Sequence, residues 1–235
     1  WSGSSLLMVG VATGAVTGVS AGVATLTYTM PTGCARFATV NVLPLPSPIS
    51  GSANVCAGSS VTLSSATAGG TWTSSNAGVV SVDATGVMTG VSSGVANITY
   101  TSANGCFVLK SVTVDPLPAV ISGAGSVCQG ESVSLLSSPA GGVWSSSAVA
   151  AATVSAAGVV TGLSAGTVHV TYMLPTGCFR TFLMTVNPLP SVITGGAVVC
   201  TGQILSLSNS TSGGVWSSDN TSVATVGAGT GDVTG

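Results

Sequence analysis

Six cysteines are the residues of this sequence whose type and spacing best fit a covalent chemistry. They fall into two series, each with a spacing of 72 residues: Cys34, Cys106 and Cys178 in one, and Cys56, Cys128 and Cys200 in the other. Such regular thiols predict disulfides in an oxidising compartment, and therefore an extracellular or cell-surface protein. A zinc site is not expected, because no CxxC spacing occurs and the chain holds one histidine.

The other residues with reactive side chains do not repeat with the cysteines. His169 has Asn97 and Thr25 at the equivalent positions of the sister copies, and Asp83 is equivalent to Ser155. A repeated calcium site would repeat its carboxylates, and nothing resembles a Ser–His–Asp set. The sequence therefore predicts no catalytic residue, no metal ion and no cofactor, and it indicates a protein that is not an enzyme.

The cysteine spacing belongs to a repeat that involves most of the chain. Aromatic residues recur with the same 72-residue spacing, and they are Trp72, Trp144, Trp216, Tyr28, Tyr100 and Tyr172. A Pro-Leu-Pro recurs at 44–46, 116–118 and 188–190. Self-similarity at a fixed period is the signature of a repeat protein. We therefore predict a tandem array.

Phased on Pro-Leu-Pro, the array consists of two complete units and two partial ones. The complete units are 47–118 and 119–190; residues 1–46 are the C-terminal part of a unit, and 191–235 are the N-terminal part of another. The half-units suggest a window from a longer polypeptide, in which targeting segments cannot be judged. Proline fixes φ at two of the three linker positions, which favours a stiff connection.

Charge is scarce throughout the sequence. Charged residues make up 3% of the chain, against about 25% in ordinary soluble domains. Three basic residues do not suit a nucleic-acid partner. The mean hydropathy is high at +0.69, but no stretch supplies the ~18–20 consecutive apolar residues of a helical membrane span. Two explanations stay open: a Ser/Thr-covered extracellular surface, or a surface buried against neighbours.

Period-two alternation predicts strands. Val168, Val170 and Tyr172 fall on one face of a strand, and the polar residues between them on the other. A second alternating strand follows over 178–188. Earlier strands are expected near 119–122, over 131–138, around Trp144, and around 151–156 and 158–162. Seven short strands in 72 residues predict an all-β, two-sheet sandwich for each unit, with the recurring tryptophans and tyrosines in its core.

The sequence of residues 141–178, "GGVWSSSAVAAATVSAAGVVTGLSAGTVHVTYMLPTGC", resembles the bacterial immunoglobulin-like domain of the second group, the type found in intimin and invasin adhesins. Related patterns occur at 72–100 and 216–226. The cysteine-bearing version that ends in Pro-Leu-Pro is similar to arrays in large secreted surface proteins of Bacteroidota-type bacteria. The resemblance implies seven-stranded immunoglobulin-like sandwiches in series, which space or present a binding tip without being enzymes.

The topology implied by that resemblance favours one disulfide. The first cysteine of a unit lies at the C-terminal end of such a sandwich and the second at its N-terminal end, so a bond within a unit would span about 25–30 Å. If units stack head to tail, Cys56 faces Cys178 of the next unit. By the same rule Cys34, Cys106, Cys128 and Cys200 pair with repeats outside this window or with other chains. Pairing within a unit through a different topology and pairing between separate chains both stay open.

These observations predict a structural repeat region of an extracellular fibre or cell-surface stalk, stiffened by interdomain disulfides and Pro-Leu-Pro linkers. Its expected partner is itself, as neighbouring repeats or as a bundled fibre, with no nucleic acid and no membrane insertion in this region. One alternative is an adhesin that binds a host, cell or glycan receptor. A second alternative is an accessory region of a large secreted enzyme.

Overall fold

The computed structural model describes residues 5–10 and 13–235, and their regular secondary structure consists of β-strands. The all-β prediction is confirmed. No helix with the length and apolarity to cross a membrane occurs in these residues. Contacts between residues define two compact units. The first contains Trp1–Pro118 and Leu174–Phe179, and the second contains Ala119–Met173 and Arg180–Gly235.

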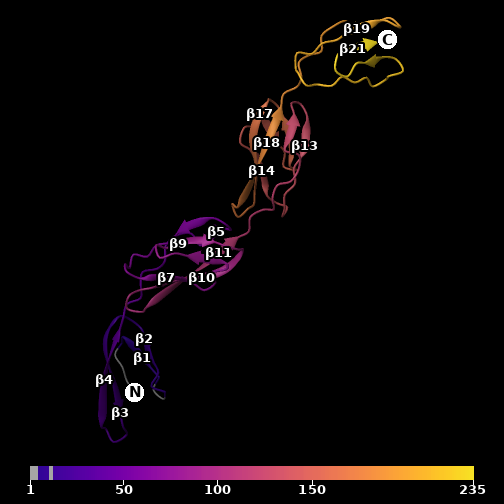
Figure 1. The fold of residues 1–235 in the computed structure, drawn as a ribbon. Coiled ribbons are helices and arrows are strands. Elements are labelled where there is room, and N and C mark those ends of the chain that lie inside the picture. Colours follow the sequence, from indigo (N-terminus) through magenta and orange to yellow (C-terminus); the bar gives the residue numbers. More distant parts are fainter. Residues whose placement is uncertain (1–4, 11–12) are drawn as a thin grey trace. The chain divides into compact units, whose positions relative to one another are not determined.

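Within the first unit, residues 47–118 form two facing sheets (Figure 1). One sheet has the strand order β5-β11-β10-β7 and the other β6-β9-β8. The strands are β5 (Asn54–Cys56), β6 (Ser60–Thr62), β7 (Thr71–Ser74), β8 (Val80–Val82), β9 (Val87–Gly90), β10 (Gly94–Thr101) and β11 (Phe107–Asp115). All pairings are antiparallel except that of β5 with β11.

Alternation in β10 and β11 explains how the core forms. Ala96, Ile98 and Tyr100 are buried on β10, as are Val112 and Val114 on β11, while the residues between them face outward. The opposite sheet contributes Val80 and Met88, both fully buried. The period-two pattern of the sequence thus places one face of each long strand against the second sheet.

The remainder of the first unit is smaller. Residues 5–10 and 13–46 form β1 (Leu7–Val9), β2 (Val16–Gly18), β3 (Gly22–Thr29) and β4 (Ala35–Val42). β1 pairs with β2, and β3 pairs with β4 in a hairpin of eight residue pairs. Their small core contains Leu7, Ala24 and Leu26.

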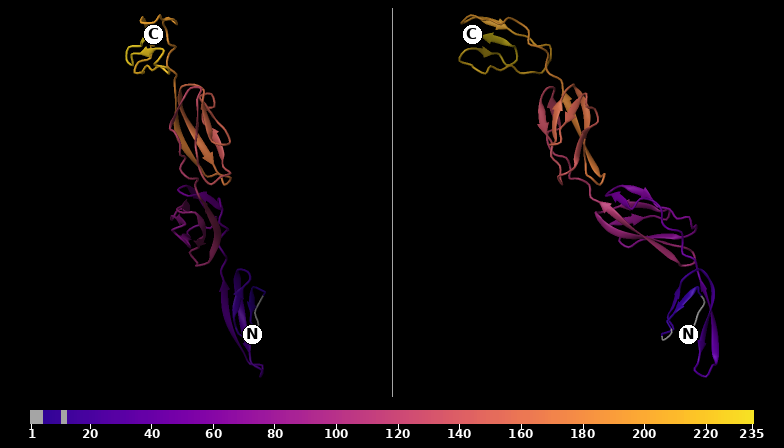
Figure 2. Two further views of the ribbon diagram at one scale, coloured as in Figure 1. Left: turned by 90° about the vertical axis from the view of Figure 1, so that its right-hand side faces the viewer. Right: turned by 180° about the vertical axis from the view of Figure 1, so that it is seen from behind.

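The second unit repeats the pattern of 47–118 over residues 119–190. Its sheets have the orders β12-β18-β17-β14 and β13-β16-β15, and Figure 2 shows the two layers from two sides. The strands are β12 (Ser126–Cys128), β13 (Ser132–Ser134), β14 (Val143–Ser146), β15 (Ala152–Val154), β16 (Val159–Gly162), β17 (Gly166–Met173) and β18 (Phe179–Asn187).

The first strand of this repeat differs from the sequence-based expectation. A strand was expected near 119–122, but that segment makes a single bridge, Ser122↔Leu136. The strand lies instead at β12, which pairs in parallel with β18. Three residues are too short to show periodicity, and a parallel pairing with a strand about sixty residues later leaves no local signal.

Residues 191–235 form three short strands, β19 (Ile204–Ser206), β20 (Thr225–Val226) and β21 (Asp232–Thr234), in one sheet of order β19-β21-β20. Residues 215–218 and 198–200, which correspond to strands in both complete repeats, are not strands here. In the complete repeats these segments pair with β10 and β11 or with β17 and β18. The two long strands that would hold them have no counterpart in 191–235.

Candidate functional site

The structure joins Cys56 to Cys178 in a disulfide, the pair that the sequence favoured. Their Cα atoms are 5.6 Å apart, and the bond closes a sequence separation of 122 residues. Cys56 belongs to the 47–118 repeat and Cys178 to the next one along the chain. The bond therefore joins two consecutive copies of the repeat, at non-equivalent positions of each.

Cys178 is presented by a tight turn between β17 and β18. The Leu174 N–H donates to the carbonyl of Cys178 at 2.8 Å, and the Gly177 N–H donates to the carbonyl of Leu174 at 2.9 Å. Gly177 has a φ of +87°, which a residue with a side chain rarely adopts. Leu174 and Cys178 are buried, and residues 174–179 make their contacts with the first unit. The "PTG" sequence thus sets the turn that carries the thiol.

Cys56 ends strand β5. It lies opposite Asp115 in the parallel pairing of β5 with β11. The Ala57 N–H donates to the carbonyl of Asp115 at 2.9 Å, and the Ser59 N–H donates to the carbonyl of Cys56 at 3.0 Å. The cysteine is therefore held by the sheet on one side and by a turn on the other, opposite Asp115, which directly precedes the Pro-Leu-Pro segment at 116–118.

The other four cysteines carry free thiols in this structure. Cys34, Cys128 and Cys200 are exposed, and Cys106 is half-buried. Cys106 occupies in β10–β11 the hairpin position that Cys178 occupies in β17–β18, and its Sγ lies 4.0 Å from the carbonyl oxygen of Leu43. No group of three or more His, Cys, Asp or Glu residues that could hold a metal ion occurs in the described ranges.

A second recurring constellation surrounds the tyrosine of each complete repeat. Trp72 and Tyr100 have ring centroids 4.6 Å apart at 53°, and Trp144 and Tyr172 have the same separation at 47°. Both tyrosines are buried, whereas the tryptophans are half-buried at the margin of the core. The tryptophans were expected in the core. Trp72 packs against the core cluster while remaining half-buried, and each tryptophan covers one side of its tyrosine.

Each tyrosine hydroxyl is held by the backbone of one loop. The Tyr172 Oη donates to the carbonyl of Pro139 at 2.7 Å and accepts from the Gly142 N–H at 2.9 Å. Tyr100 makes the same pair of bonds, to the Thr67 carbonyl and from Gly70. We call this arrangement, a tryptophan face with one glycine N–H and one carbonyl, the tyrosine cradle. Its sequence signal is a glycine two positions before each tryptophan.

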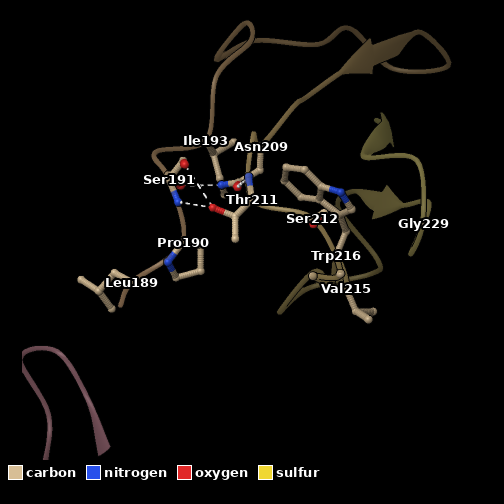
Figure 3. A pocket seen from close by; sticks show the side chains of 12 residues that line it. Leu189, Pro190, Ser191, Ile193, Asn209, Thr211, Ser212, Val215, Trp216 and Gly229 are labelled. Carbon is tan, nitrogen blue, oxygen red and sulfur yellow. Dashed lines mark hydrogen bonds between the residues drawn. The ribbon is translucent and has the colours of Figure 1, made fainter. Parts of the chain in front are cut away.

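Tyr28 and Trp216, which were also expected in a core, are less covered. Tyr28 is 46% exposed. Trp216 is half-buried and lines an open pocket of about 580 Å³ in residues 189–229 (Figure 3). Thr211 and Gly214, the equivalents of Thr67 and Gly70, line the same pocket.

The remaining polar candidates have structural roles. His169 is exposed on β17, and its backbone N–H donates to Ser147 Oγ at 2.9 Å, as the backbone N–H of Asn97 does to Ser75 Oγ. The Asp83 carboxylate closes the turn before β9. The Thr85 hydroxyl hydrogen bond, followed by backbone donors that include the Val87 N–H, lowers the pKa of Asp83. This turn role was not predicted from the sequence.

The strand order and the two facing sheets of each complete repeat define an immunoglobulin-like β-sandwich. The family model of the bacterial Ig-like domain (group 2) matches residues 49–114 and 108–183. These matches span more than half of the sequence, and the chain belongs to this family. The resemblance read from the tryptophan-containing motifs is confirmed.

Three solved structures with similar folds are 17–19% identical to this chain. A C-terminal fragment of intimin, solved with the intimin-binding domain of its translocated receptor, is 17% identical over 65% of this chain and 67% of that one, with a TM-score of 0.42. Invasin, a bacterial integrin-binding protein, is 18% identical with a TM-score of 0.42; 80% of this chain is covered, against about half (49%) of invasin. Domains 4 and 5 of the S-layer protein SbsC are 19% identical, with 62% and 100% coverage and a TM-score of 0.31. No curated protein matches the chain.

Proposed function

We propose that residues 1–235 are a non-enzymatic structural stretch of an extracellular fibre or cell-surface stalk, in which disulfides tie each repeat to the next. The observation that carries this proposal is the Cys56–Cys178 bond, which joins two consecutive repeats rather than two positions of one repeat. A bond of that kind restrains two sandwiches together. A disulfide within a sandwich would stabilise each repeat alone.

The 72-residue spacing of the cysteines suggests that the free thiols also form bonds between consecutive repeats. Cys128 and Cys200 are equivalent to Cys56, and Cys34 and Cys106 are equivalent to Cys178. In a continuing array each would find its partner 122 residues along the chain, outside residues 1–235, or at the same place on another chain. Their exposure, or half-exposure for Cys106, leaves them accessible for such bonds.

Composition supports a structural role. A chain with 3% charged residues and a net charge of −2 offers little repulsion between neighbouring copies. Its partner in this proposal is therefore itself, along the array and side by side. An extracellular location follows from the use of disulfides, which persist in oxidising compartments.

Electron microscopy of the native material, with and without reductant, tests the proposal. We expect long uniform fibres whose axial repeat is roughly the length of one sandwich, 35–45 Å for strands of this size. Non-reducing peptide mapping should recover Cys56 linked to Cys178, and reduction should loosen the fibres. Short isolated rods, or fibres that do not respond to reductant, would remove the support for disulfide-tied repeats.

A further inference from the structure

One face of each complete repeat carries the exposed apolar side chains of its strands. In residues 47–190, all of which the structure describes, every exposed large apolar residue that belongs to a strand lies on a four-stranded sheet. Their exposed fractions range from 44% to 64%. These residues are Val95, Phe107 and Leu109 in the first complete repeat, and Val143, Met173, Phe179 and Leu183 in the second. The three-stranded sheets contribute none.

The pairing register brings these side chains together on the outer side of the sheet. Residues directly opposite each other on paired strands point to the same side. Thr101 of β10 lies opposite Phe107 on β11 and Thr71 on β7, all labelled strands in Figure 1. In the second repeat Met173 lies opposite Val143. The row that is threonine and phenylalanine in one repeat is thus more apolar still in the next.

The outer face of the three-stranded sheets is hydroxylated instead. Ser60 and Thr89 lie opposite each other, with their hydroxyl oxygens 2.7 Å apart. Ser132 and Thr161 make the same contact at 2.7 Å in the second repeat. Both faces belong to the same sandwich, yet only one carries large apolar side chains. Contiguous exposed apolar residues of this kind mark an interaction surface.

Basic side chains are kept off the apolar face. Lys110 lies opposite Ile98 on the core side of β11, and its Nζ donates to the carbonyl of Ile49 at 3.3 Å. Arg180 occupies the core-facing register of β18. The charged residue that remains on the outer side of these strands is Asp115, at the end of β11. A second uncharged face can therefore pack here without burying an unpaired charge.

The face recurs along the chain, because both complete repeats have the same strand order. A partner that contacts consecutive repeats must present its own contacts at the same spacing. A second copy of this chain has that spacing. Two such faces can pack as the two sheets of a sandwich do, about 10 Å apart.

We propose that the outer face of the sheet β5-β11-β10-β7, with the equivalent face of the next repeat, packs against the same face of a second copy of this chain. This inference deepens the proposed function: it rests on the side-by-side association of the array and names the surface that mediates it.

The size of the face sets the strength of the contact. Its strands contain 3, 4, 8 and 9 residues, and at about 16 Å² per residue of sheet they cover about 400 Å². Two faces in contact bury about 800 Å², less than the about 1,200 Å² of a stable complex. Two pairs of repeats together reach about 1,600 Å². One pair therefore binds weakly, and repeats in tandem bind more firmly.

Self-association of the whole chain tests the proposal. The background variant replaces the four free cysteines by serine, which prevents linkage through thiols and keeps the Cys56–Cys178 bond. Sedimentation velocity over a concentration series should show reversible oligomers. Oxidation of Met173 by hydrogen peroxide reports whether the face is covered, and its rate should fall as the protein concentration rises. Met8, which is 64% exposed on β1 and outside the face, should react at a constant rate.

Leu109→Lys/Leu183→Lys in this background is the decisive variant, because it places one lysine on the proposed face of each complete repeat. Thr62→Lys/Ser134→Lys is the matched control, since it adds the same two charges at exposed positions of the three-stranded sheets. We expect self-association weakened by about 100-fold in the first variant, where like charges face each other. The control should associate as the background does, and both variants should keep the thermal transition.

A chain that stays monomeric at its solubility limit would overturn the proposal. So would an association that Leu109→Lys/Leu183→Lys leaves unchanged, or one that both variants weaken equally. The disulfide-tied array is tested separately, because every variant retains Cys56 and Cys178. Peptide mapping reports that bond whether or not the chains associate.

Discussion

Replacing Cys56 by serine opens the covalent loop that the bond to Cys178 closes. That loop has a sequence separation of 122 residues, so the loop-closure entropy removed from the unfolded chain corresponds to about 5 kcal/mol at 25 °C. Cys56 is the better position to change, because Cys178 is fully buried and serine there would also bury a hydroxyl. With an m-value of about 2 kcal/mol/M, the urea midpoint should fall by about 2.5 M.

Urea unfolding followed by tryptophan fluorescence measures the change, with and without reductant. Cys128→Ser is the matched control: it is the equivalent residue of the next repeat, exposed and unbonded, and its effect should stay within about 0.5 kcal/mol. Reductant should lower the wild-type midpoint to that of Cys56→Ser and leave the variant unchanged. If Cys56→Ser unfolds at the midpoint of Cys128→Ser, the bond contributes nothing to stability and the entropic argument is wrong.

Three further predictions concern the repeats themselves. Gly142→Ala should destabilise its repeat by about 1–3 kcal/mol in thermal or urea unfolding, since a Cβ there would lie 2.4 Å from Tyr172 Cζ. Gly214→Ala is the control and should be as stable as the wild type, because a Cβ there meets no atom within 4 Å. Equal losses of stability at both sites would refute the steric reason. Tyr172→Phe should lose about 1–2 kcal/mol in the same assay, because the carbonyl and N–H that hold the hydroxyl lose their partner; no loss would show that water replaces it. In the folded protein the pKa of Asp83 lies below its ordinary value of 3.8, chiefly because of the Thr85 hydroxyl hydrogen bond. The contribution of Asp83 to folding stability is therefore present above the unfolded pKa and is lost as pH falls through the folded pKa. The urea midpoint, measured as the pH is lowered, should show this loss of stability in the wild type and less of it in Asp83→Asn. Identical pH profiles for the two proteins would show that the Asp83 carboxylate does not stabilise the fold.

Local patterns carried most of the fold prediction. The alternation in Val168, Val170 and Tyr172 was enough to place β17, since all three are buried. The strand β12 escaped because three residues show no period and its partner β18 lies far along the chain. Parallel pairing between distant segments depends on the closed sandwich, which a local pattern cannot express.

The candidate site was likewise predicted only in part from the sequence. The cysteine period and the topology of an immunoglobulin-like sandwich together favoured Cys56 with Cys178, since a bond within one repeat would have to span the sandwich. The tyrosine cradle was not predicted from the sequence, because no local pattern distinguishes Gly70 and Gly142 from the turn glycines directly before them. Gly69 and Gly141 have φ of +73° and +94° and make the turn. The glycine that follows each of them makes room for the ring.

The bond between Cys56 and Cys178 also changes how the chain carries tension. A pulling force that enters before Cys56 crosses the two sulfur atoms and continues after Cys178. The 121 residues between them, one fewer than the sequence separation of 122, are then outside the loaded path. Fully extended they would span about 400 Å. While the bond is oxidised that length cannot be drawn out, and reduction alone would turn a nearly inextensible segment into one that lengthens under load.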